Sequence, residues 1–251
     1  MRKTVVNLIL LAACALSGIH PAGARAASLP LYHASYAVSR NGFQIGVAEF
    51  SLRRNQDGSY QFQSVTRATG LAALFFSDVV TESSHFRISD GRLESLLYEY
   101  RHSGGDHDRS EKIRFDWNRC RAESIDGKQH KSVEIEPGIY DRALAQLAIS
   151  LDVANDKLAE VYRVFDHGEI SSYRLEREDY VKLSTPAGRY QTRKVARKDS
   201  RKKRVTTFWL GTTLDYLPVR IEQTEPGKAT IGLTLSGIKF DSAEPSPSSG
   251  S

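Results

Sequence analysis

Apolar and polar residues alternate along most of the chain from Leu31 onward, a pattern typical of β-strands with one buried face. The alternation is clear at residues 96–100, 113–117 and 133–135, and glycine-containing turn signals separate these runs. It resumes at residue 160 and continues to residue 240. The pattern therefore predicts about a dozen strands joined by short turns, with antiparallel neighbours.

Two hairpins can be predicted in detail. The Asn-Gly pair at residues 41–42 is a strong signal for a two-residue turn, which would pair Val38 with Ile45. The next turn is a three-residue loop at residues 56–58 that ends in a left-handed glycine, and it would pair Leu52 with Phe62.

One segment has a different period. In the sequence YDRALAQLAISLDV, residues Leu144, Leu147 and Leu151 recur at helical spacing, and Asp141 is placed to cap the helix. A change of apolar phase between residues 47 and 50 indicates a β-bulge, and bulges bend sheets. The predicted fold is mainly β: a strongly curved antiparallel sheet or open half-barrel of about a dozen strands, with one substantial helix.

The first residues have the order of a secretory signal peptide. Arg2 and Lys3 precede an uncharged apolar run at residues 5–19, and residues 24–26 form an Ala-x-Ala cleavage signal. The apolar run is shorter than the roughly 18–20 residues that a spanning helix needs. We expect residues 1–26 to be a signal peptide, residues 27–240 to form a single exported, periplasmic β-rich domain, and residues 241–251 to be a disordered tail.

The two cysteines bear on anchoring and on redox chemistry. Leu-Ala-Ala-Cys at residues 11–14 resembles a lipobox, so the alternative to cleavage after Ala26 is acylation of Cys14 and attachment to a membrane. After cleavage at Ala26, Cys120 is the remaining cysteine and has no disulfide partner in the chain. We expect it to be a small buried apolar residue rather than a catalytic one.

Charge is concentrated in one place. Loss of Arg2, Lys3 and Arg25 would leave 32 basic and 30 acidic residues, which does not indicate a nucleic-acid partner. Residues 193–204 nevertheless hold eight basic residues and one acid at a hairpin tip. They are either solvated residues that discourage edge pairing or a contact for an anionic membrane surface. The basic residues are Arg193, Lys194, Arg197, Lys198, Arg201, Lys202, Lys203 and Arg204.

Several short motifs resemble one bacterial family of exported proteins, domain of unknown function 3108. They include Tyr36-x-Val38 with Gly42-x-x-x-Gly46, the turn Thr69-Gly70-Leu71, Gly91-Arg92-Leu93, and the late segment WLGTTLDYLPVRIE. The resemblance implies no reaction and no catalytic residues. It does imply a fold similar to the half-barrels of periplasmic lipoprotein carriers and related lipid-binding proteins.

The segment TGLAALFFSD interrupts the strand pattern with a short apolar run. It would lie at the mouth of the half-barrel, where it either fills the core or acts as a lid over a cavity of lipid size. The predicted lid residues are Leu71, Leu74, Phe75 and Phe76.

The chain lacks the common catalytic motifs, and we expect neither an enzyme nor a cofactor. His102, Asp106, His107, Asp108 and Glu111 lie close together in sequence, but their spacing fits no zinc or calcium pattern, so no metal site is predicted there. The leading hypothesis is a binding protein for a hydrophobic or amphipathic envelope ligand. The alternatives are an assembly or scaffold factor that binds another envelope protein and, with less support, a polysaccharide hydrolase. The oligomeric state is not predicted.

Overall fold

The first half of the chain forms a meander in which each strand pairs with the next. The structure is a computed structural model and describes residues 29–74, 78–104, 108–199 and 203–241. All neighbouring strands of this half are antiparallel. The strands are β1 (Tyr32–Arg40), β2 (Phe43–Arg54), β3 (Tyr60–Ala68), β4 (Val79–Ser89), β5 (Arg92–Ser103), β6 (Arg109–Asp116), β7 (Arg121–Asp126) and β8 (Gln129–Glu134).

The second half completes the same sheet. A 3-10 helix, η1 (Gly70–Leu74), follows β3, and the single α-helix among the described residues, α1 (Arg142–Ala154), separates the two halves. The remaining strands are β9 (Ile139–Tyr140), β10 (Val161–Asp166), β11 (Glu169–Thr185), β12 (Gly188–Asp199), β13 (Arg204–Gly211), β14 (Pro218–Thr224) and β15 (Ile231–Phe240). The first strand pairs with the last, so the order in the sheet is β8-β7-β6-β5-β4-β3-β2-β1-β15-β14-β13-β12-β11-β10-β9.

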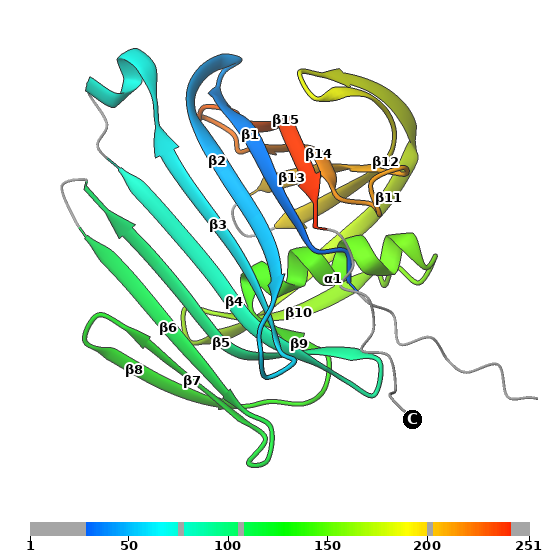
Figure 1. The fold of residues 1–251 in the computed structure, drawn as a ribbon. Coiled ribbons are helices and arrows are strands. Elements are labelled where there is room, and N and C mark those ends of the chain that lie inside the picture. The colour runs from blue at the N-terminus through cyan, green and yellow to red at the C-terminus, as the bar shows by residue number, and fades with distance from the viewer. Residues whose placement is uncertain (1–28, 75–77, 105–107, 200–202, 242–251) are drawn as a thin grey trace, which may run out of the picture.

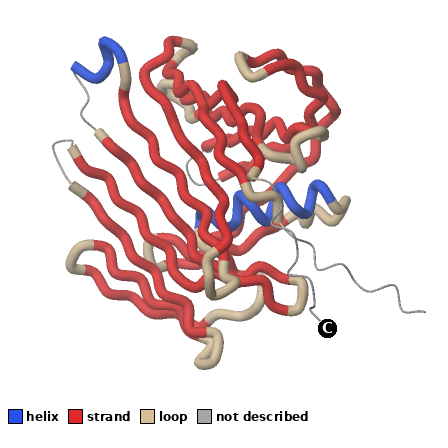
Figure 2. Tube along the Cα trace, in the orientation of Figure 1, coloured by secondary structure: helices blue, strands red, loops and turns tan. Residues whose placement is uncertain are grey.

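The fold prediction is confirmed: one strongly curved sheet forms an open half-barrel around one substantial helix (Figures 1 and 2). The sheet has fifteen strands rather than about a dozen, and the short β9 joins its neighbour β10 in parallel. Register shifts interrupt five of the strand pairs. Since each such irregularity bends and twists a strand, they contribute to the curvature.

The first two hairpins test the detailed predictions. The turn at residues 41–42 is present, and both of its residues have positive φ as this turn type requires. The predicted pairing of Val38 with Ile45 is wrong, because a bulge next to this turn makes Ile45 the extra residue and pairs Val38 with Gly46. The second hairpin has the predicted pairing of Leu52 with Phe62. The bulge predicted between residues 47 and 50 is absent, because β2 pairs with β3 without a register shift over this range and Val47 simply points away from the buried face.

The helix begins where its cap predicts. Asp141 accepts the backbone N–H of Leu144 at 2.8 Å and the hydroxyls of Ser84 and Ser95 at 2.6 and 2.7 Å. The carboxyl is fully buried, and burial raises its pKa to about 6 although these three donors oppose the shift. The cap thus also attaches the helix to β4 and β5.

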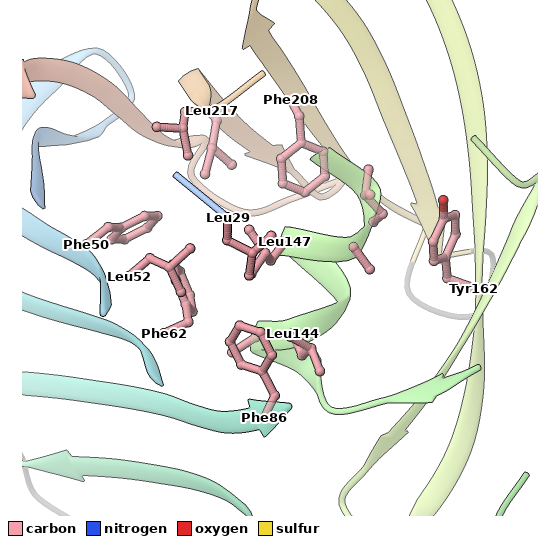
Figure 3. Close-up of a cluster of buried hydrophobic side chains, with 14 of the residues drawn as sticks. Leu29, Phe50, Leu52, Phe62, Phe86, Leu144, Leu147, Tyr162, Phe208 and Leu217 are labelled. Atoms are coloured by element: carbon pink, nitrogen blue, oxygen red, sulfur yellow. The ribbon is translucent and has the colours of Figure 1, made fainter. Parts of the chain in front are cut away.

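The helix lies on the concave side of the sheet and supplies much of the core. Figure 3 shows Leu144 and Leu147 of α1 close to side chains from strands of both halves of the sheet. Alternation of more and less buried residues along strands such as β1 and β3 brings one row of apolar side chains to this face. The other core residues labelled in Figure 3 are Leu29, Phe50, Leu52, Phe62, Phe86, Tyr162, Phe208 and Leu217.

Two further observations concern exposure. Cys120 is exposed in the turn between β6 and β7, so the expectation of a buried cysteine is wrong. Its φ of 49° belongs to a turn position, and turns lie at the surface. Within the described part of the chain, no helix has the length and apolar character needed to cross a membrane.

Candidate ligand-binding cavity

The half-barrel is hollow above the helix. A cavity of about 280 Å³ lies between α1 and the concave face of the sheet. Its walls are mainly apolar and come from both halves of the sheet, because inward-facing positions of β2 and β3 lie opposite those of β13, β14 and β15. The apolar lining residues are Phe50, Phe62, Val80, Ala143, Ala145, Ile149, Phe208, Ile221 and Leu233.

A second cavity, of about 620 Å³, extends this space toward the end of the half-barrel that carries η1 and the β1–β2 turn (Figure 1). We call the 280 Å³ cavity the deep cavity and the 620 Å³ cavity the mouth. The two adjoin, because Thr66, Val80 and Gln223 line both of them. The mouth also has apolar walls, to which Val38, Ile45 and Ile231 contribute. Each volume is within or close to the range of about 300–1,000 Å³ usual for small-molecule sites.

Gly46 allows the strands at the mouth to approach closely. A Cβ atom at this position would lie 2.4 Å from the backbone oxygen of Arg67 on β3. Any larger residue would therefore separate β2 from β3 at the wall of the mouth. This steric requirement gives a physical reason for the glycine.

The floor of the deep cavity is a charged network centred on Arg142. Its Nε donates to Oε1 of Glu82 at 2.8 Å, and its Nη2 donates to the hydroxyl of Tyr98 at 2.6 Å. Tyr98 donates in turn to Glu82 at 2.8 Å, and Asp166 lies 3.4 Å from Nη1. Burial opposes the charged form of Arg142, but Glu82, Tyr98 and Asp166 raise its pKa overall. The guanidinium therefore stays charged in a partly buried position.

A second arginine lines the deep cavity from β12. The guanidinium of Arg197 stacks over the ring of Tyr173 at 4.4 Å and donates to the hydroxyl of Thr206 at 3.0 Å. Burial raises the pKa of Tyr173, and Arg197 offsets part of that shift. The cavity thus combines apolar walls with a few fixed polar groups, as ligand sites commonly do.

The mouth carries more cations than anions on its inner side. Arg204 and Lys228 both bind the carboxylate of Glu225, at 3.0 and 2.6 Å. The hydrogen bond from Lys228, together with Arg204, lowers the pKa of Glu225. Arg40 follows the inward-facing Val38 by two positions on β1, and its side chain forms no hydrogen bond or ion pair with the described residues. Arg40 is therefore available to a negatively charged group.

The predicted lid segment lies beside this mouth. Thr66 and Ala68, at the end of β3, line the mouth, and η1 begins two residues later. Leu71 and Leu74 are 80% and 76% exposed, so neither side chain fills the core. Phe75 and Phe76 lie outside the described residues.

Strand alternation divides the basic run between the two faces of the sheet. Arg197 and Arg204 line the cavities, whereas Lys194 and Lys198 lie on the opposite face. There Lys194 binds Glu178 and Lys198 binds Glu176, each at 2.6 Å. The run is therefore not one continuous basic face.

Two other members of the run, Arg193 and Lys203, lie on β12 and next to β13. Arg193 stacks over the ring of Tyr180 at 4.4 Å, and Lys203 is exposed in the turn before β13. Arg201 and Lys202 lie outside the described residues, as does Cys14 of the alternative lipidation site.

Of the histidines and acids at residues 102–111, the three that the structure describes do not come together. His102 binds Asp78 at 2.6 Å, and Asp108 accepts the backbone N–H of Gly104. Glu111 is buried and faces a different set of residues. Asp106 and His107 lie outside the described residues.

Sequence reasoning missed the floor of the cavity. Glu82, Tyr98, Arg142 and Asp166 come from four separate elements, and no local motif connects them. One local signal was present: Arg142 is a cation in the first turn of a helix whose first turn has no acidic residue. Since the helix dipole disfavours cations there, a tertiary partner could have been expected.

Comparison with solved structures identifies the fold. A β-barrel-like protein from Brucella abortus, of domain of unknown function DUF1849, has a TM-score of 0.53 and 9% identity over 85% of this chain and 99% of its own. Two others have lower TM-scores: a putative lipoprotein from Parabacteroides distasonis (0.31; 10% identity; 84% and 96% covered) and the Pseudomonas aeruginosa MucA/MucB complex (0.18; 9% identity; 87% and 96% covered).

Comparison with curated protein sequences finds no significant match. Residues 32–234, from the first strand into the last, match the family described as "Protein of unknown function (DUF3108)". The matched range includes the residues that line both cavities and the helix beneath them. The chain belongs to this family.

Proposed function

We propose that this protein is a non-enzymatic binding protein for an amphipathic ligand with an acyl chain and an anionic head group. The acyl chain would lie in the deep cavity, against the apolar side chains of β2, β3 and β13–β15. The head group would remain at the mouth, near Arg40, Arg204 and Lys228. Burial of apolar chain surface would provide most of the binding free energy, at about 25 cal/mol per Å².

The observation that carries this proposal is the continuity of the two cavities. A filled core would favour a scaffold that binds through its outer surface, but here the concave face encloses space next to a more open, cation-bearing mouth. Glu82 is the single carboxylate among the described lining residues of the deep cavity, and it is bound to Arg142. Two-carboxyl glycoside hydrolysis needs a pair, which supports a non-enzymatic role.

The same proposal includes the cellular location of the protein. We infer export through the signal peptide at residues 1–26, with action at the periplasmic side of the envelope. Lipidation at Cys14 is the alternative form and would hold the half-barrel at a membrane that contains such ligands. Intact mass of the exported protein distinguishes the two forms, because only one of them retains residues 14–26.

The first test is native mass spectrometry of the protein purified from the periplasmic fraction of its own host. We expect a bound mass of lipid size that is released on unfolding. The second test measures binding of a fluorescent fatty acid to the delipidated protein. Val80→Trp should weaken this binding strongly, because Val80 lines both cavities and an indole would occupy the space where they adjoin.

A matched control is available on the same strand. Val79 precedes Val80, is exposed, and lines neither cavity, so Val79→Trp should bind the probe as the unmodified protein does. Melting temperatures of the two variants check that both fold. A clean apo mass together with equal probe binding by both variants would refute the cavity and leave the scaffold role as the better explanation.

A further inference from the structure

Away from the cavity, Glu111 of β6 is a buried carboxylate with one oxygen unsatisfied. Its side chain has no exposed surface. Oε1 accepts the hydroxyl of Ser124 and the backbone N–H of His167, each at 2.9 Å, whereas Oε2 has no hydrogen-bond partner. Buried charges in proteins are generally paired or coordinate metal ions, so this oxygen requires an explanation.

The Nδ1 atom of His167 lies 3.1 Å from this oxygen. The same nitrogen lies 3.1 Å from Nη2 of Arg109. If Nδ1 carries a proton, it can satisfy Glu111 but then opposes the Arg109 donor. If Nδ1 is unprotonated, it accepts from Arg109 and leaves Glu111 unsatisfied. Neither tautomer of the neutral ring satisfies both neighbours.

A third residue completes the cluster. Asp166 precedes His167, and one ligand atom each from Glu111, Asp166 and His167 lie within 4.8 Å of one another. We propose that these three residues form a binding site for a divalent transition-metal ion such as Zn²⁺. An unprotonated imidazole and two carboxylates are suitable ligands for this class of ion, with water at the remaining position.

The spacing of two of the ligand atoms and the access from solvent fit such an ion. Zinc–ligand bonds of about 2.0–2.1 Å at tetrahedral angles place neighbouring ligand atoms about 3.3 Å apart, close to the Glu111–His167 separation. His167 is 41% exposed, so an ion can enter from solvent. The turn that carries His167 has two residues with positive φ: His167 at 53° and Gly168 at 72°. Histidine adopts this left-handed conformation more often than most residues, and glycine adopts it freely.

Nearby charges also leave room for a cation. Arg109 is held by Asp126 at 2.9 Å, and Arg142 is held by Glu82 in addition to its longer contact with Asp166. The three carboxylates of Glu111, Asp126 and Asp166 outnumber the two guanidiniums. A bound divalent ion would therefore neutralise an excess negative charge rather than oppose a positive one.

The site would join distant parts of the sheet. Glu111 lies on β6, near one edge of the sheet, and His167 lies in the turn between β10 and β11, near the other edge. Among the described strands, no backbone ladder pairs these two regions directly, because β8 and β9 are the ends of the strand order. A metal ion here would clamp the two ends of the half-barrel beside Arg142 of the cavity floor.

The test uses protein purified without a polyhistidine tag and stripped with a chelator, and the probe is Zn²⁺ alone. We expect calorimetry to give one site per chain, the melting temperature to rise with Zn²⁺, and Co²⁺ to give the visible absorption of a low-symmetry N/O site. His167→Asn should keep the turn, because asparagine accepts positive φ, yet weaken Zn²⁺ binding at least about tenfold.

Two further variants make the result specific. Asp166→Asn should weaken Zn²⁺ binding like His167→Asn. His130→Asn removes a different histidine–carboxylate pair, 3.8 Å from Glu123 on the surface, and should leave Zn²⁺ binding unchanged. The proposal is overturned if the folded protein binds no Zn²⁺ at millimolar concentration, or if His167→Asn binds it as well as His130→Asn does.

Discussion

Arg142, the first residue of α1, donates from Nε to Oε1 of Glu82 on β4 over 2.8 Å, and this ion pair fixes the helix beneath the deep cavity. The side chains of both residues are about one-quarter exposed. Tyr98 donates to the same carboxylate oxygen and accepts from Arg142, so three elements share one network. The position of the cavity floor therefore depends on this arginine.

Replacement of Arg142 by methionine should lower the free energy of unfolding by about 3 kcal/mol, because it leaves Glu82 and Asp166 without their cation in a mostly buried site. Urea denaturation followed by circular dichroism measures this change. The control is Arg87→Met, which breaks the more exposed pair with Glu94 and should cost about 0–1 kcal/mol. Equal losses in the two variants would contradict a structural role for the network.

The buried cap predicts a pH dependence of stability. In the fold the pKa of Asp141 is raised to about 6, chiefly by burial, against an ordinary value of 3.8. The folded state therefore binds this proton more tightly than the unfolded chain. The resulting stabilisation is complete below pH 3.8 and is lost as the pH rises through 6.

Asp141→Asn tests this dependence, because an amide can still cap the helix but does not titrate. The difference in unfolding free energy between Asp141→Asn and the unmodified protein should change by up to about 3 kcal/mol between pH 3.5 and pH 7, in the direction that favours the unmodified protein at low pH. Contributions of other groups cancel in this difference. A difference that is constant with pH would show that the pKa of Asp141 is the same in the folded and unfolded states.

Selectivity for an anionic head group should depend on Arg40. Arg40→Gln should weaken binding of a long-chain fatty acid several-fold while leaving a neutral monoacylglycerol unaffected, because only the former has a charge for the guanidinium. Competition against a fluorescent probe measures both. The control is Arg101→Gln on β5, an exposed arginine that lines neither cavity. If Arg101→Gln has the same effect as Arg40→Gln, the head group is not bound at the inner side of the mouth.

The tip of the basic hairpin makes a separate prediction. Lys194 and Lys198 are already paired with glutamates, so a contact with an anionic membrane would fall to the tip. Lys202→Glu combined with Lys203→Glu should weaken binding to anionic vesicles at least about tenfold, because each cation near the membrane contributes about 1 kcal/mol to the binding free energy. The effect should disappear at high salt and on zwitterionic vesicles. Unchanged vesicle sedimentation would show that the tip is merely solvated.

Local signals predicted the elements well. The Asn-Gly turn, the loop that pairs Leu52 with Phe62, and the cap at Asp141 each depend on residues a few positions apart, and each is confirmed. The bulge in β2 was predicted between residues 47 and 50 but lies at Ile45, because a single extra residue in a strand leaves no strong pattern in sequence.

The sites depended on contacts that sequence alone does not reveal. Glu82 and Arg142 are sixty positions apart, and Glu111 and His167 are fifty-six apart. The number of charges in the basic run also did not show that the run is divided between the two faces of the sheet. Alternate residues of a strand face opposite sides. Arg197 was consequently grouped with surface lysines although it lines the cavity.

The segment beside the mouth provides the last prediction. Leu71 and Leu74 of η1 are among the most exposed large apolar side chains in the described part of the chain, although they follow a strand that lines the mouth. Exposed leucines gain about 1.5–3 kcal/mol each when they become fully buried, so closure of the segment over a bound acyl chain would be favourable.

Leu71→Ser combined with Leu74→Ser should therefore accelerate release of a fluorescent fatty acid several-fold and change stability little, because both side chains are exposed in the free protein. Stopped-flow displacement measures the release rate, and thermal melts measure stability. Phe43→Ser is the control: this residue is also exposed, at 78%, but it lies at the β1–β2 turn and lines neither cavity. Equal release rates in the two variants would mean that η1 does not act as a lid, and that the acyl chain is retained by the cavity walls alone.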